Sequence, residues 1–97
     1  MKYFSWDVEK NERLKSGRGI SFEEIVLAIE SGGLRDLLVH PNQRQYPGQL
    51  ILVVAYGDYA YLVPSVEENT HYFLKTIIPS RKATREYLER KTLDEEA

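Results

Sequence analysis

The chain has 97 residues, of which 42% are hydrophobic and 29% charged, and its formal net charge is −2 at pH 7. This size and balance predict one globular domain over residues 1–97 and argue against native disorder. The absence of cysteine excludes disulfides, thiolate catalysis and cysteine-ligated metals, and two histidines are too few for a histidine-dominated metal site. We therefore expect no metal and no cofactor.

No membrane segment or signal peptide is predicted. The longest apolar run, residues 50–56, is far shorter than the roughly 20 residues that cross a bilayer as a helix. The first residues lack the apolar core of a signal peptide. We expect a soluble, cytoplasmic protein that contacts no membrane.

The beginning of the chain predicts a short strand followed by a polar helix. Apolar and polar side chains alternate over residues 2–6, as in a short strand at the edge of a sheet. The carboxylate of Asp7 can cap a helix that runs to about residue 16. Gly17 and Gly19 are expected to end this helix.

A second helix is expected to begin after Ser21. Ser21 and Glu24 have the spacing of a capping box, in which each side chain accepts a hydrogen bond from the other residue's backbone N–H. Apolar residues then recur at helical spacing on one stripe: Phe22, Ile25, Val26 and Ile29. Gly32 and Gly33 supply a left-handed stop.

Strand patterns follow at residues 34–40, 50–56, 59–66 and 70–78. The second of these is apolar on both faces, as in a central strand that is covered on each side. Gly57 and Asp58 suit a type II′ hairpin turn. Pro64 indicates a bulge or an unpaired amide, and Pro79 is expected to end the last strand.

Thr84 is expected to cap a final helix that runs to about residue 92, with Tyr87 and Leu88 as its apolar anchors. Residues 94–97 are expected to be a frayed tail. Grouped strands joined by hairpins predict an α+β fold. We expect an antiparallel sheet of four to five strands, with two N-terminal helices and one C-terminal helix packed on one face.

The cations are concentrated in two segments. The first basic island consists of Lys10, Arg13, Lys15 and Arg18. The second basic island consists of Lys75, Arg81, Lys82, Arg85, Arg90 and Lys91. The two islands could form one anion-binding face if the fold brings them together, or they could be solvated helix faces without a ligand.

The residue types available for catalysis are those that RNA cleavage needs without a metal. RNA supplies its own nucleophile in the 2′-hydroxyl, so the protein must position it, neutralise the phosphate and move protons. Arg81 and Lys82 come between a strand and a helix, where donors can converge on an anion. Lys75 would share a strand face with Arg81 if the strand stayed regular.

Two histidines are candidates for proton transfer near neutral pH. His71 shares strand parity with Lys75 and is therefore preferred to His40. The alternative for each is a partly buried structural histidine. The tyrosines of the strands could stack on bases, although aromatic residues at this spacing more often complete a core or a protein interface.

Three segments resemble the BrnT toxins of bacterial type II toxin–antitoxin systems. They are residues 2–11, which contain the pattern F-x-W-D-x-x-K, residues 18–24, which include the capping box, and residues 78–85, which read Ile-Pro-Ser-Arg-Lys-Ala-Thr-Arg. The resemblance covers nearly the whole chain in the same order. The family has Lys-His-Gly where this chain has Gly17-Arg18-Gly19, so the family's imidazole is replaced by a guanidinium.

The resemblance implies a small RelE-like ribonuclease fold, metal-independent cleavage of mRNA, and neutralisation by an antitoxin, often of the ribbon–helix–helix type. It places Arg81 on the arginine of the family's late motif, with Lys82 and Thr84 as its neighbours. We expect a toxin in which Arg18 and Arg81 bind the substrate phosphate.

The remaining roles in this hypothesis fall to other cations and to a proton carrier. Lys75 or Lys82 assists at the phosphate, and His71 or a tyrosine moves the proton. The expected RNA-binding residues are Lys15, Lys82 and Arg85. The alternatives are a non-catalytic protein- or RNA-binding module of the same fold, and a translation-associated regulator that binds RNA without cutting it.

Overall fold

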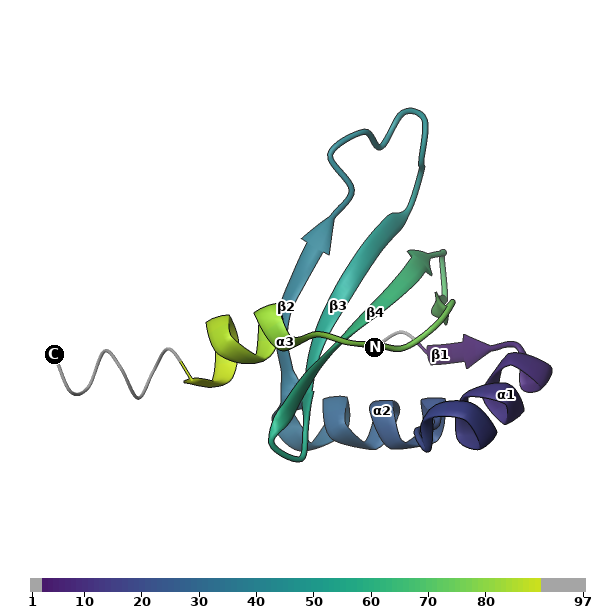
Figure 1. Ribbon diagram of the computed structural model, residues 1–97. Coiled ribbons are helices and arrows are strands. Elements are labelled where there is room, and N and C mark those ends of the chain that lie inside the picture. Colours follow the sequence, from purple (N-terminus) through teal and green to yellow (C-terminus); the bar gives the residue numbers. More distant parts are fainter. Residues whose placement is uncertain (1–2, 90–97) are drawn as a thin grey trace, which may run out of the picture.

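The computed structural model describes residues 3–89 and has an α+β architecture (Figure 1). The expected end of the last helix near residue 92 and the expected tail at residues 94–97 lie outside the described residues. The fold class predicted from the sequence is confirmed. Within residues 3–89, no helix combines the length and the apolar character needed to cross a membrane.

The strands form a mixed sheet in the order β1-β5-β4-β3-β2, with β6 pairing with β4. Their bounds are β1 Tyr3–Trp6, β2 Leu34–Val39, β3 Gln49–Tyr56, β4 Tyr59–Glu67, β5 His71–Leu74 and β6 Ile78–Pro79. The expectation of a purely antiparallel sheet is wrong, because β1 runs parallel to β5. These two strands are not joined by a hairpin, so no tight turn imposes the antiparallel direction on them.

The first helix, α1 (Val8–Arg18), begins as predicted. Asp7 accepts hydrogen bonds from the backbone N–H groups of Glu9 and Lys10. The helix runs two residues beyond its expected end because Gly17 is accommodated inside it, and Gly19 ends it with a left-handed φ of 67°. The helical N-terminal segment is therefore correctly predicted, and its C-terminal boundary is not.

The second helix, α2 (Phe22–Ala28), has the predicted capping box. The Ser21 hydroxyl accepts from the Glu24 backbone N–H, and the Glu24 carboxylate accepts from the Ser21 N–H. A wider helical turn, η1 (Ile29–Gly33), extends it to the predicted glycine stop, where Gly32 has a φ of 92°. The chain then turns and continues as β2.

The expected strand at residues 70–78 is divided into β5 and β6. The Lys75 N–H still donates to the Pro64 carbonyl, but Ile77 turns inward and is fully buried. Pairing with β4 resumes only at Ile78, and Pro79 lies inside β6 rather than after the strand. In a regular strand the side chains of Lys75 and Ile77 would lie on the same face of the sheet. Ile77 is buried while Lys75 is exposed because the strand is interrupted between them.

The last helical segment consists of α3 (Arg81–Thr84) and η2 (Arg85–Glu89). Its N-cap is Ser80, whose hydroxyl accepts from the Ala83 N–H, so the expectation that Thr84 caps this helix is wrong. Thr84 is buried, and its hydroxyl donates to the Ser80 carbonyl and accepts from the Ala60 N–H. This side chain therefore fastens the helix to β4.

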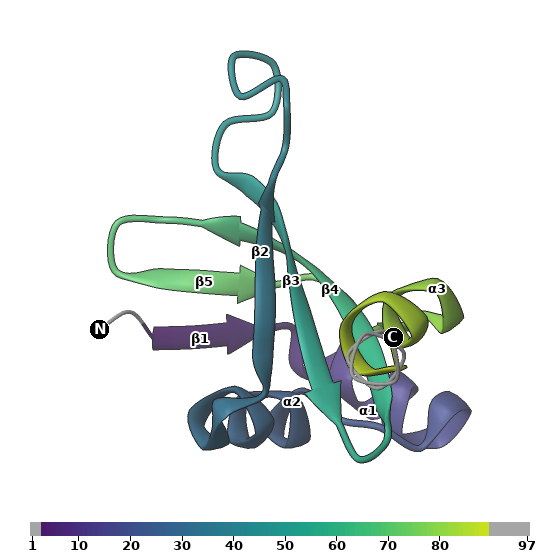
Figure 2. The same cartoon turned by 90° about the vertical axis from the view of Figure 1, so that its left-hand side faces the viewer.

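Helices cover both faces of the sheet, which corrects the expectation of one covered face (Figure 2). On the α2 face, Phe22 and Ile25 pack against Leu52 and other inward residues of β3, β4 and β5. On the opposite α3 face, Ala83 packs against Val53 and Ala60. The second core is much smaller, so α3 and η2 leave part of the α3 face uncovered.

Candidate functional site on the open face of the sheet

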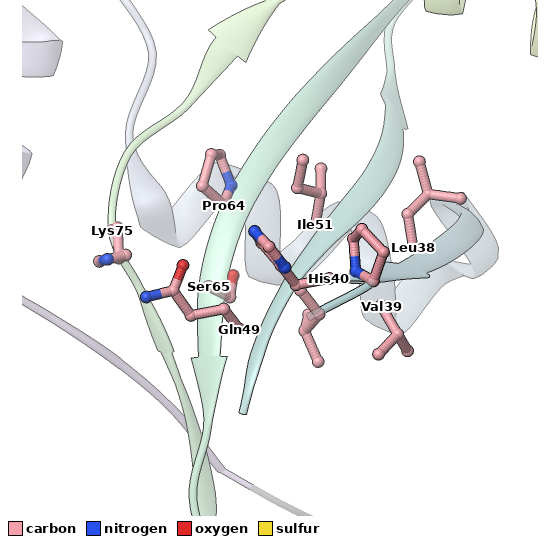
Figure 3. Close-up of a pocket in the computed structure, with 10 residues that line it drawn as sticks. Leu38, Val39, His40, Gln49, Ile51, Pro64, Ser65 and Lys75 are labelled. Atoms are coloured by element: carbon pink, nitrogen blue, oxygen red, sulfur yellow. The ribbon is translucent and has the colours of Figure 1, made fainter. Parts of the chain in front are cut away.

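The uncovered part of the α3 face forms a groove of about 280 Å³ (Figure 3). The β2–β3–β4 register places Leu38, Ile51 and Pro64 side by side across its floor. His40 lies on the β2 side of this groove and Lys75 lies on the β5 side. The groove therefore combines an apolar floor with two nitrogen-bearing side chains that approach it from opposite sides.

Lys75 reaches the groove because β5 ends one residue earlier. Its backbone N–H donates to the Pro64 carbonyl, which holds it beside β4, and its side chain is exposed. Among the described residues its ammonium group has no hydrogen-bond or ion-pair partner, so it is available to an anion. Of the predicted catalytic residues, Lys75 is the one that lines this groove.

His40 is held at the end of β2 by three contacts. Its backbone N–H donates to the Gln49 carbonyl, its Nδ1 accepts from the Asn42 N–H at 3.0 Å, and its ring centroid lies 4.4 Å from that of Tyr46. The neutral ring therefore carries its proton on Nε2. Within residues 3–89 this Nε2 has no hydrogen-bond partner.

The loop that carries His40 projects from the sheet between β2 and β3 (Figure 1). The Gln43 side chain closes its base, since Nε2 donates to the carbonyls of His40 and Gln49 and Oε1 accepts from the Gly48 N–H. Gly48 has a φ of 77°, and a Cβ there would lie 2.6 Å from the Glu67 carbonyl oxygen. These contacts give His40 a fixed position without any ligand.

One cation of α3, Lys82, lies next to the groove. Lys82 lines a second hollow of about 220 Å³, and Leu38 lines both hollows, so the two adjoin on the α3 face. Arg81, Lys82 and Arg85 are all exposed. Arg90 and Lys91, the other members of the second basic island after Lys75, lie outside the described residues.

The first basic island does not reach this groove. Nη1 of Arg18 donates to the Ile77 carbonyl at 2.6 Å, so part of its guanidinium ties α1 to the segment between β5 and β6. Nζ of Lys15 pairs with Glu12 at 3.1 Å, and this carboxylate raises the pKa of Lys15. Among the described residues no hydrogen bond or ion pair connects Arg18 with Arg81.

His71 lies at the opposite end of β5 from Lys75. Nε2 of His71 lies 2.9 Å from a Glu68 carboxylate oxygen, and Nδ1 lies 3.3 Å from the Thr70 hydroxyl, so both ring nitrogens have partners. Four residues of extended chain separate His71 from Lys75 by roughly 13 Å. The predicted catalytic residues Arg81, Arg18, Lys75 and His71 thus do not surround one point.

Sequence reasoning named His40 but preferred His71 for its parity with Lys75. Parity along one strand says nothing about neighbouring strands, and the groove is built across β2, β3 and β4 and the segment that follows β5. Two features could have indicated His40: it lies on the same strand face as Leu38, and residues 34–40 pair with residues 50–56 in one hairpin. That pairing places His40 opposite Gln49.

Glu24, which the sequence predicts to be part of the capping box, has a structural role. Oε1 accepts from the Ser21 N–H and hydroxyl, and Oε2 accepts from the Tyr56 hydroxyl at 2.6 Å. The Tyr56 hydrogen bond lowers the pKa of Glu24, and the carboxylate in turn raises the pKa of Tyr56. This carboxylate is fully occupied in joining α2 to the end of β3.

Among residues 3–89, no three His, Asp or Glu side chains are grouped as a metal ion would need.

The chain matches no protein-family model, no curated protein and no solved structure. The resemblance to BrnT toxins therefore remains a hypothesis based on its three sequence segments.

Proposed function

We propose that this protein is a metal-independent endoribonuclease that cleaves mRNA as the toxin of a type II toxin–antitoxin system. The observation that carries the proposal is the groove on the α3 face, with Lys75 and His40 on opposite sides of an apolar floor. The BrnT-like segments add the expectation of an antitoxin partner and a cytoplasmic location.

The groove has the features that a single-stranded RNA requires. Apolar side chains at its floor, such as Ile51 and Pro64, can contact bases, while the Lys75 ammonium can bind a phosphate oxygen. Lys82 lines the adjoining hollow and can bind the next phosphate along the strand. Arg81 and Arg85 are exposed on α3 and η2 and can bind phosphates further along it.

The proposed reaction is a transesterification within the RNA. The 2′-oxygen attacks the adjacent phosphorus while the bond from phosphorus to the 5′-oxygen breaks, which leaves a 2′,3′-cyclic phosphate and a 5′-hydroxyl. The 2′-hydroxyl proton passes to solvent. Protonation of His40 at Nδ1 breaks the hydrogen bond from the Asn42 N–H and makes the ring an imidazolium, whose Nε2 proton can pass to the leaving 5′-oxygen.

This proposal changes the proton carrier expected from the sequence. His71 was preferred there, but its Nε2 is paired with Glu68, whereas Nε2 of His40 faces the groove side without a partner among the described residues. Because the first basic island does not reach the groove, Arg18 could bind only a phosphate outside it, through the guanidinium nitrogens that do not donate to the Ile77 carbonyl.

A non-catalytic RNA- or protein-binding module is the second candidate. It is favoured by the separation of Arg18 and His71 from the groove and by their engagement with other groups of the protein. Such a module would bind RNA in a salt-dependent way and leave it intact.

The two candidates are separated by incubating purified protein with labelled single-stranded RNA in the presence of EDTA. The endoribonuclease predicts cleavage that falls about 10- to 100-fold in Lys75→Ala, which loses a charged phosphate ligand. It also predicts a loss of about 100-fold or more in His40→Ala. Arg13→Ala, an exposed cation of α1 outside the groove, is the matched control. Binding without cleavage by the wild type would select the module.

A further inference from the structure

Strand β2 is an outer edge of the sheet (Figure 2). It carries several large apolar side chains that are exposed. Leu34, Leu37, Leu38 and Val39 are 41%, 38%, 43% and 58% exposed. These side chains lie on both faces of the strand, so no single helix could cover them. A long apolar edge of this kind is a template for pairing with another strand.

The backbone of this edge is also free to pair. His40 donates its N–H to Gln49 on β3, and because backbone groups alternate along a strand, Leu37 and Val39 direct theirs outward. The outward N–H of Leu37 is held by its neighbour's side chain, since Oδ1 of Asp36 accepts from it at 2.8 Å. A carbonyl oxygen of a partner strand can replace this local acceptor.

We propose that β2 pairs antiparallel with β2 of a second copy of this chain, with the two-fold axis at Leu38. Leu38 then lies opposite Leu38 of the second copy, and Leu37 lies opposite its Val39. Asp36 lies opposite its His40. Each Leu37–Val39 pair exchanges both backbone hydrogen bonds, as antiparallel pairs of this type do.

This register is self-complementary on both faces. Apolar side chains meet apolar side chains at Leu37, Leu38 and Val39, and a carboxylate meets an imidazole. Placing the axis at Leu37 would put Asp36 opposite Leu38, and placing it at Asp36 would put two carboxylates opposite each other, which is destabilising. Two-fold pairing of one patch with itself is the usual geometry of a homodimer.

The pairing also adds a carboxylate to each groove. When Leu37 donates its N–H to the second copy, Oδ1 of Asp36 is released and can accept a hydrogen bond from Nε2 of the facing His40. Each groove would then contain a carboxylate from the other copy beside its imidazole. Because Nδ1 already accepts from the Asn42 N–H, this contact occupies the Nε2 proton that the proposed cleavage uses, and a bound RNA must displace the carboxylate.

Because the chain has no cysteine, single-cysteine variants test the register directly. Leu38→Cys places two thiols in a non-hydrogen-bonded pair, where Cα atoms are about 4.5 Å apart and a disulfide can form. Mild oxidation should convert this variant to a covalent dimer of twice 11.3 kDa. Val39→Cys should not cross-link with itself, because the two copies of residue 39 lie roughly 8 Å apart. A mixture of Leu37→Cys and Val39→Cys should cross-link.

Leu27→Cys is the matched control, because Leu27 is 62% exposed on α2, away from β2. Sedimentation of the unmodified protein should show a dimer, and Leu38→Lys, which faces its own positive charge across the axis, should shift it to monomer. A wild-type monomer at all concentrations, or equal cross-linking of Leu38→Cys and Leu27→Cys, would overturn the proposal. Cross-linking of Val39→Cys alone would overturn the register.

Discussion

The Tyr87 hydroxyl donates a hydrogen bond to Oδ2 of Asp36 at 2.6 Å and so joins η2 to the edge strand β2 across 51 residues of sequence. The same carboxylate accepts the Leu37 N–H through Oδ1. The bond to Tyr87 lowers the pKa of Asp36, and the carboxylate raises the pKa of Tyr87. Asp36 therefore connects the C-terminal helix, the open face of the sheet and the exposed edge.

This contact predicts a pH-dependent stability. Because the pKa of Asp36 is lowered in the fold, its contribution is present above its ordinary value of 3.8 and is lost as the pH falls through the folded value. Because the pKa of Tyr87 is raised, its contribution is present below 10.0 and is lost as the pH rises through the folded value. Thermal melts should show Tyr87→Phe less stable than wild type at pH 7, with the difference shrinking at both extremes.

Tyr46→Phe is the control for this melt series, because the Tyr46 hydroxyl makes no hydrogen bond within residues 3–89. It should melt like the wild type at every pH. A Tyr87→Phe variant whose deficit is the same at pH 3 as at pH 7 would show that the hydroxyl–carboxylate bond is not the source of the effect.

Thr84 provides a second attachment of the C-terminal helix. Its hydroxyl accepts from the buried Ala60 N–H at 2.8 Å and donates to the Ser80 carbonyl at 2.7 Å. Thr84→Val keeps the shape but leaves a buried donor unsatisfied, which should cost about 1–3 kcal/mol in urea unfolding. Ser16→Ala removes an exposed hydroxyl bonded to the Glu12 carbonyl and should change stability by less than about 0.5 kcal/mol. Equal losses in the two variants would refute this role.

Gly17 inside α1 and Gly19 at its C-cap should respond in opposite directions to substitution by alanine. Gly17 is helical and a Cβ there meets nothing within 4 Å, so Gly17→Ala should stabilise by about 0.5–1 kcal/mol. Gly19 has a φ of 67°, so Gly19→Ala should destabilise by about 1 kcal/mol despite equally open space. Chemical denaturation of both variants measures the two signs, and two changes of the same sign would contradict the expectation.

Arg18 and Arg81 should differ in what their removal affects. Arg18→Ala loses the hydrogen bond to the Ile77 carbonyl and should lower the free energy of unfolding by about 1 kcal/mol. Arg81 is exposed and has no hydrogen bond through its side chain among the described residues, so Arg81→Ala should leave stability within about 0.5 kcal/mol. In the RNA assay Arg81→Ala should slow cleavage about tenfold. Unchanged cleavage in Arg81→Ala would remove it from the site.

The features predicted correctly from the sequence are those that depend on near neighbours. The Asp7 cap and the capping box of Ser21 and Glu24 each involve residues within one helical turn. The turn at Gly57, which has the positive φ that its first central position requires, is equally local. In these cases a side chain and the backbone it serves are read from the same short segment.

The features that were missed depend on residues far apart in the sequence. Thr84 looks like a helix cap, but the Ala60 N–H on β4 engages its hydroxyl and Ser80 becomes the cap. The parallel pairing of β1 with β5 and the inward turn of Ile77 also follow from tertiary packing. None of these long-range contacts produces a repeating pattern in the nearby sequence.

The residues of the candidate site also differ in whether local sequence could identify them. Lys75 was selected from the sequence because it lies on the strand expected at residues 70–78 and would share a face with Arg81 if that strand stayed regular. The choice between His40 and His71 required the cross-strand register, which also brings Tyr87 to Asp36. A strand assigned only by alternation gives the face of a residue but not its neighbours across the sheet.

The most direct test of the proposed activity is the nature of the cleaved bond. The purified protein should be incubated in EDTA with a single-stranded RNA and with the same RNA carrying a 2′-deoxy sugar at each cleaved nucleotide. The proposal predicts 2′,3′-cyclic phosphate ends from the first substrate and no cleavage of the second at those positions. Cleavage that persists at the 2′-deoxy positions, or RNA that is bound but left intact, would contradict it.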